Sequence, residues 1–157
     1  CREAIEDYRE ALEKDPKMTF GYLRRGRAYL CIKEYERAIS DLGTALSASP
    51  NLTEAHLYIG QARFEKRDFA GAIEGYSKAL EGSSGLKNTH RDRAMAYLTL
   101  GNYQAALEDI TEYIKYDPLN TDSYRIRADI YDKLDEPERA SEDRKRARFG
   151  PDKVQQK

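Results

Sequence analysis

Hydrophobic residues return every three or four positions along most of the chain, which is the spacing of a one-sided α-helix. A clear example has its apolar positions at Tyr35, Ala38, Ile39, Leu42, Ala45 and Leu46. The preceding segment, residues 22–32, carries a second apolar face. Pro50 cannot continue a helix, and Thr53 followed by Glu54 favours a new helix start. The pattern predicts pairs of helices joined by tight turns.

The apolar pattern repeats with a period of 34 residues. One column of this repeat holds only alanine, at Ala4, Ala38, Ala72, Ala106 and Ala140. Prolines recur at the ends of units, at Pro16, Pro50 and Pro118. A period of this length is typical of a solenoid, because a single helical hairpin cannot bury its apolar face and stacked hairpins share one core.

These columns resemble the tetratricopeptide repeat family over nearly the whole chain. The first helix of the family carries an aromatic residue, then a small residue, then a tyrosine. The aromatic positions hold Tyr22, His56, His90 and Tyr124; the small positions hold Gly26, Gly60, Ala94 and Ala128; the tyrosine positions hold Tyr29, Arg63, Tyr97 and Tyr131, of which Arg63 departs from the pattern. The resemblance implies an all-α fold, a right-handed α-solenoid of stacked helix-turn-helix hairpins.

The period divides the chain into one half repeat and four complete repeats. The expected boundaries are 1–18 for the second helix of a truncated repeat, 19–52, 53–86 and 87–120 for complete repeats, 121–152 for a repeat with a polar capping helix, and 153–157 for a tail. The helix expected over residues 2–14 lacks a first-helix partner. We therefore expect the chain to be a fragment of a longer array, since an exposed apolar face is costly. A lipid anchor on Cys1 is the alternative.

The last expected helix is polar where earlier repeats are apolar, at Ser141, Arg144 and Arg148. A polar outer face is what the end of a solenoid requires. The basic run in this helix leaves a second interpretation open, contact with an acidic partner or nucleic acid.

Composition excludes several classes of protein. The chain has 27 basic and 28 acidic residues, a net charge of −1, which disfavours nucleic-acid binding through a basic surface. No apolar run approaches the ~20 residues of a membrane helix. Cys1 and Cys31 are too few for a disulfide framework and have no metal-site spacing. A reducing, cytoplasmic setting without membrane contact is the default expectation.

Motifs for catalysis or cofactor binding are missing from the sequence. There is no glycine-rich phosphate loop, and no serine or cysteine nucleophile has a histidine positioned by spacing. His56 and His90 lie one period apart, so a shared metal ion is conceivable. Both histidines occupy the family's core aromatic position, which favours packing. We predict a protein that is not an enzyme, with no cofactor and no metal site.

In the family, the first helices line a concave groove that receives a partner. The resemblance predicts partner-binding positions at Leu23, Arg27, Leu57, Tyr58, Gln61, Phe64, Arg91, Met95 and Arg125, and it also places Phe20, Arg24 and Leu30 of the first complete repeat in the groove. Apolar positions flanked by arginines predict a protein or peptide partner with apolar anchors and acidic flanks. The alternative is a groove without a dominant ligand, or one filled by another part of the full protein.

Chaperone-binding members of the family hold a C-terminal carboxylate with lysine, asparagine and arginine side chains. Counted from the first complete repeat, the matching positions are Leu23, Arg27, Tyr58, Asn88 and Asp92; counted one repeat later, they are Leu57, Gln61, Asp92, Asp122 and Ile126. Asp92 would repel a carboxylate in either register. A heat-shock chaperone tail is therefore a disfavoured partner.

The residues and the resemblance together predict a non-catalytic protein–protein interaction module that acts as a scaffold or adaptor. Two alternatives remain open at this point. One is a structural packing component of a large multiprotein assembly. The other is a regulatory, co-chaperone-like module of an enzyme that lies outside this chain.

Overall fold

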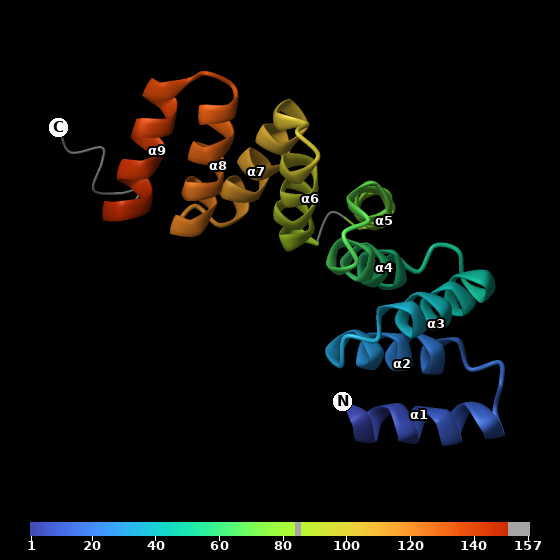
Figure 1. Ribbon diagram of the computed structural model, residues 1–157. Coiled ribbons are helices and arrows are strands. Elements are labelled where there is room, and N and C mark those ends of the chain that lie inside the picture. The colour runs from blue at the N-terminus through green and yellow to red at the C-terminus, as the bar shows by residue number, and fades with distance from the viewer. Residues whose placement is uncertain (84–85, 151–157) are drawn as a thin grey trace. The chain divides into compact units, whose positions relative to one another are not determined.

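The computed structural model describes residues 1–83 and 86–150, and every regular element in these ranges is an α-helix (Figure 1). The helices are α1 (Arg2–Lys14), α2 (Thr19–Cys31), α3 (Tyr35–Ala48), α4 (Thr53–Glu65), α5 (Phe69–Gly82), α6 (Lys87–Thr99), α7 (Tyr103–Tyr116), α8 (Thr121–Lys133) and α9 (Pro137–Phe149). The all-α fold class predicted from the sequence is confirmed. Residues 84–85 and the expected tail at 153–157 lie outside the described residues.

The chain forms two compact units, Cys1–Gly85 and Leu86–Lys157. The first unit contains α1 to α5, in which each helix packs against the next and α2 also lies against α4. The second unit contains α6 to α9, and again each helix packs against its successor. Helices α2, α4, α6 and α8 are the first helices of hairpins, and they begin at 34-residue intervals, at Thr19, Thr53, Lys87 and Thr121.

Each hairpin turn contains one residue in the left-handed region of the backbone. These residues are Lys33 (φ 63°), Arg67 (φ 66°), Gly101 (φ 77°) and Asp135 (φ 60°). The backbone N–H of the next residue then bonds the carbonyl five positions earlier, as from Glu34 to Tyr29 at 2.9 Å. This arrangement ends the first helix by satisfying one of its free carbonyls and turns the chain toward the second helix.

Small residues allow the two helices of a hairpin to pack closely. The alanine column is fully buried in the four complete hairpins, at Ala38, Ala72, Ala106 and Ala140. A methyl group added to Gly26 would stand 2.8 Å from Cγ of Leu42, and one added to Gly60 would stand 2.7 Å from the ring of Tyr76. The glycines therefore make room for large buried side chains of the partner helix.

Three of the four complete hairpins carry a buried arginine–aspartate pair between their helices. The pairs, each sixteen residues apart and each with two hydrogen bonds, are Arg25–Asp41, Arg93–Asp109 and Arg127–Asp143. Each arginine also lies over a tyrosine ring of its own helix, as Arg127 lies 5.5 Å from the ring centre of Tyr124. These pairs could not be recognised from the sequence pattern, because their two members lie on different helices.

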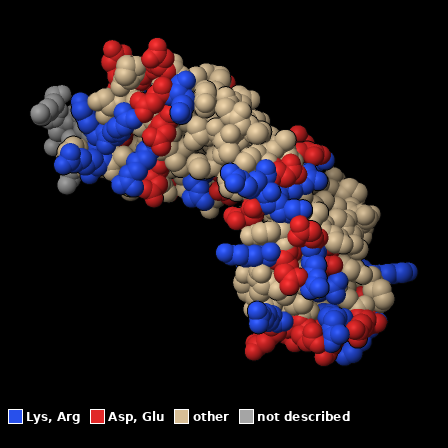
Figure 2. Space-filling model, viewed as in Figure 1, with Lys and Arg blue, Asp and Glu red and all other residues tan. Residues whose placement is uncertain are grey.

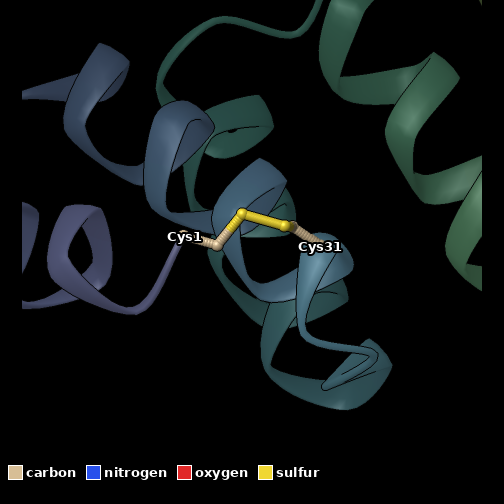
Figure 3. The surroundings of a disulfide bond; sticks show 2 residues. All are labelled: Cys1 and Cys31. Carbon is tan, nitrogen blue, oxygen red and sulfur yellow. A yellow bond between two sulfur atoms is a disulfide. The ribbon is translucent and has the colours of Figure 1, made fainter.

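A disulfide bond joins Cys1, just before α1, to Cys31, the last residue of α2 (Figure 3). Their Cα atoms lie 6.3 Å apart. This bond was not predicted, because two cysteines are too few for a disulfide framework and the sequence favoured a reducing environment. Its cause is the packing of α1 against α2, because two helices of 13 residues joined by a short turn bring the start of one beside the end of the other. None of the described helices is both long and apolar enough to cross a membrane.

Candidate functional site

The first unit brings predicted partner-binding residues of two helices into contact. The guanidinium of Arg27 on α2 lies 5.9 Å from the ring centre of Tyr58 on α4. Arg27 is exposed and Tyr58 is half-buried, so both side chains reach the surface. We call the face formed by Phe20, Arg24 and Arg27 of α2 with Leu57, Tyr58, Gln61 and Phe64 of α4 the α2–α4 surface.

The α2–α4 surface combines basic groups on α2 with apolar groups on both helices. Phe20 is 63% exposed at the start of α2, and Arg24 is exposed one turn later. On α4, three half-buried side chains recur at steps of four and three residues and therefore share one face, at Leu57, Gln61 and Phe64. Phe64 also packs edge to face on Phe69 of α5, with ring centres 5.3 Å apart. Part of its ring is thus fixed while the rest stays accessible.

Leu23 does not belong to this surface. Its side chain is fully buried, in a cluster with Leu42 of α3 and Ile59 of α4. The expectation that Leu23 faces a ligand is therefore corrected. The reason is that α4 packs beside α2 and α3, so that this leucine fills the space among three helices.

The second unit holds the other three predicted residues, on α6 and α8. Arg91 and Met95 are half-buried on α6, and Arg125 is exposed on α8. Arg91 bonds the neighbouring Asp92 at 3.1 Å and lies 5.6 Å from the ring centre of Tyr113. Arg125 bonds Asp122 at 2.6 Å, one turn earlier on the same helix.

These partners reduce the net charge that the second unit presents. Burial lowers the pKa of Arg91, but the hydrogen bonds and the charge of Asp92, together with Tyr113, raise it by more. The pKa of Arg91 is therefore raised overall. The guanidinium therefore stays charged beside a carboxylate. On the visible face of each unit, basic and acidic side chains lie next to one another (Figure 2). The strongest uncompensated basic groups among the predicted residues and their neighbours are Arg24 and Arg27 of the first unit, for which the described residues show no ion pair.

His56 takes a structural position that tyrosine fills in two other repeats. Its Nε2 atom lies 3.0 Å from the carbonyl oxygen of Pro50. The hydroxyl groups of Tyr22 and Tyr124 donate corresponding hydrogen bonds to the carbonyls six residues before them. A pocket of about 710 Å³ opens beside His56, lined by Leu46, Pro50, Asn51, His56, Lys78, Glu81 and Gly82. Its two charged residues, Lys78 and Glu81, have opposite signs, and Lys78 bonds Glu74.

His90 has a different set of partners. Its Nδ1 atom lies 3.1 Å from Oδ1 of Asp109, and its ring stacks on Tyr116 at 6.1 Å. Asp109 thus accepts hydrogen bonds from Arg93 and also lies within hydrogen-bond distance of His90. Within residues 1–83 and 86–150, no three His, Cys, Asp or Glu residues are grouped so that they could hold a metal ion.

The helical hairpins, their 34-residue interval and the buried alanine column point to one repeat family. The tetratricopeptide repeat matches the sequence over residues 1–52, 23–86 and 91–152. The chain belongs to the tetratricopeptide repeat family. Members of this family are generally interaction modules without catalytic activity, so the chain is a protein–protein interaction module at this level of description.

Solved structures show the same fold at low sequence identity. A MamA crystal structure superposes with a TM-score of 0.88 at 21% identity, covering 95% of this chain and 87% of that chain. MamA from Desulfovibrio magneticus RS-1 gives a TM-score of 0.89 at 15% identity, covering 99% and 88%. YrrB, described as a TPR protein with an unusual peptide-binding site, gives 0.83 at 20% identity, covering 98% and 77%. No curated protein matches the chain in sequence.

Proposed function

We propose that this tetratricopeptide repeat chain is a non-catalytic adaptor that binds a peptide segment of a partner protein on the α2–α4 surface. The observation that carries the proposal is the contact of Arg27 with Tyr58, which joins two successive first helices into one continuous surface. The peptide-binding site named for YrrB supports a peptide as the form of the ligand.

The chemistry of the surface specifies the partner. Phe20, Leu57 and Phe64 offer apolar area, and aromatic anchors commonly dominate the energy of such interfaces. Arg24 and Arg27 offer positive charge that would pair with carboxylates. The ligand is therefore an extended segment or a helix with one or two apolar side chains next to aspartate or glutamate.

The second unit contributes less to this proposal. Arg91 and Arg125 are each paired with an aspartate of their own helix. A heat-shock chaperone tail stays a disfavoured partner, because the carboxylate of Asp92 would repel the carboxylate at the end of the tail. We propose that Arg91, Met95 and Arg125 modulate binding rather than anchor it.

The test is selection of peptides from a random phage-displayed library on the wild-type chain. Acidic residues next to apolar residues are expected in the selected peptides. The double variant Arg27→Glu with Tyr58→Ala should lose these peptides, since it reverses a charge and removes an anchor. Lys17→Glu is the matched control, because it makes the same change of charge in the α1–α2 turn. Retention of the same peptides by the double variant would overturn the proposal.

The cellular setting is a separate part of the proposal. The sequence favours the cytoplasm, whereas the Cys1–Cys31 disulfide favours an oxidising compartment. We propose that the chain acts where this bond can form. Alkylation of free thiols at the moment of cell lysis, followed by mass spectrometry, tests it: unmodified, linked cysteines support the proposal and fully alkylated cysteines refute it.

A further inference from the structure

We infer that the Cys1–Cys31 disulfide is a redox-sensitive clamp that holds α1 in place and thereby controls ligand binding on the α2–α4 surface. The clamp itself follows from the geometry of α1 and α2, and its effect on binding rests on the function proposed above. The two parts are therefore tested by different measurements.

Within residues 1–83, few buried side chains hold α1 against α2. Leu12 is the only buried residue of α1, and Ile5 and Tyr8 of its apolar face are only half-buried. Leu12 lies near the end of α1 that the turn already joins to α2, where it packs on Gly21: a methyl group there would stand 2.8 Å from its Cδ2. The opposite end of the helix, around Ala4 and Ile5, has no buried side chain. Among the described residues, packing therefore leaves this end without a restraint.

The disulfide supplies that restraint. Cys1 precedes the first residue of α1, so the bond to Cys31 fixes the end of α1 that packing leaves loose (Figure 3). The turn between Lys14 and Thr19 fixes the other end. With both ends held, α1 cannot separate from α2 without unfolding. Because elements with few buried contacts open most easily, α1 is the element whose order would change most when the bond is broken.

Cys31 also belongs to the exposed face of α2 that forms part of the α2–α4 surface. It follows Arg27 by four residues and Arg24 by seven, a spacing that places all three on one side of the helix. All three are exposed. The bond therefore anchors the Cys1 segment at the end of the arginine row. Reduction would free the Cys1 segment that lies against the last turn of α2.

Both cysteines are exposed, so a small thiol can reach the bond. A glutathione thiolate attacks one sulfur and forms a mixed disulfide, which a second glutathione resolves. In the balanced reaction, the protein disulfide takes up two electrons and two protons to give two thiols, and two glutathione molecules are oxidised to one glutathione disulfide. The reverse reaction closes the clamp.

The experiment measures hydrogen exchange of the full 157-residue chain in reduced and oxidised glutathione buffers, with intact mass reporting the state of the bond. Reduction is expected to accelerate amide exchange in residues 2–12 by about tenfold or more. Helix α8 has no cysteine and serves as the internal reference, with unchanged exchange. The double variant Cys1→Ser with Cys31→Ser should exchange rapidly in both buffers. Equal protection of α1 in both buffers, or a bond that resists reduced glutathione, would overturn the clamp.

Binding is measured separately with the peptides selected on the oxidised chain. Reduction of the wild type should weaken their binding at least about threefold, since an ordered surface binds at a lower entropic cost. The double serine variant should show the weaker affinity in both buffers. If α1 loosens while affinity stays constant, the regulatory part is wrong although the clamp stands. If no peptide is selected at all, the proposed function fails, and hydrogen exchange still decides the clamp.

Discussion

Arg25 and Asp41 join α2 to α3 through two charge-assisted hydrogen bonds. The Nε atom of Arg25 donates to Oδ2 of Asp41 at 2.7 Å, and Nη2 donates to Oδ1 at 2.9 Å. Their side chains are only 18% and 11% exposed. The hydrogen bond to Asp41 is the main reason that the pKa of Arg25 is raised, so the guanidinium stays charged in the folded state.

The second hairpin replaces both members of this pair at once. Adding 34 to the two residue numbers gives Ile59 and Gly75, both of which are buried. An isolated arginine or aspartate at either position would be a buried charge without its partner, which is costly. The two positions therefore change together, from an ion pair to two uncharged buried residues.

Removal of one member of the pair should be strongly destabilising. Arg25→Ala leaves the buried carboxylate of Asp41 without the guanidinium, and we expect a loss of about 2–4 kcal/mol of unfolding free energy. The double variant Arg25→Ala with Asp41→Ala should be more stable than Arg25→Ala, because no buried charge remains unpaired. Urea denaturation of the wild type, both single variants and the double variant gives the coupling energy. Additive effects of the two single changes would contradict a coupled pair.

The close approach of α4 and α5 at Gly75 gives a second prediction. A methyl group on Gly75 would stand 2.8 Å from both N and Cα of Gly60, atoms of the backbone that cannot move aside. Gly75→Ala should therefore force the helices apart and cost about 1–3 kcal/mol. Gly43 of α3 is the matched control, because nothing lies within 4 Å of an added methyl group. Gly43→Ala should stabilise the helix by about 0.5–1 kcal/mol. Thermal or urea denaturation that gives the same sign for both changes would contradict this packing.

The four turn residues at positive φ predict how substitutions at these positions rank by their effect on the unfolding free energy. Lys33 and Arg67 pay a steric cost at positive φ, whereas aspartate tolerates this conformation better and glycine best. Lys33→Gly and Arg67→Gly should each raise the unfolding free energy by about 0.5–1 kcal/mol, and Asp135→Gly by less. Gly101→Ala should lower it by about 1 kcal/mol. Denaturation curves of the four variants check this order, and a gain for Gly101→Ala would refute it.

The helical spacing of apolar residues, the 34-residue period and the family resemblance that they carry were enough to predict the all-α fold. The helix starts, the buried alanine column and the small residues of the first helices all follow from residues that recur at one interval. This worked because each repeat must present the same apolar face to its neighbours. In such a protein, the pattern of residues within one repeat therefore also predicts how neighbouring repeats pack.

The contacts between positions in different columns could not be predicted in the same way. Arg25 and Asp41 look like ordinary surface charges until the hairpin brings them together. Leu23 was placed on the binding face by analogy, but the packing of α4 beside α2 buries it. Cys1 and Cys31 meet only because α1 and α2 are equally long and pack against each other across a short turn. Each case depends on a distance across the fold that sequence spacing does not measure.

The pH dependence of Glu74 gives the last prediction. Hydrogen bonding to Lys78, and then to Arg63, lowers the pKa of this glutamate below its usual value. A carboxylate with a lowered folded-state pKa contributes stability above its unfolded pKa and loses it as the pH falls through its folded pKa. Because Glu74 is exposed, the contribution at pH 7 should be below about 1 kcal/mol and should shrink in high salt. Urea denaturation should show Glu74→Gln to be less stable than the wild type at pH 7 and equal to it at a pH below both pKa values. Glu81→Gln on the same helix serves as the control, since the described part of the chain shows no ion pair for Glu81. A deficit for Glu74→Gln that persists unchanged in acid would mean that the glutamate acts through packing rather than through its charge.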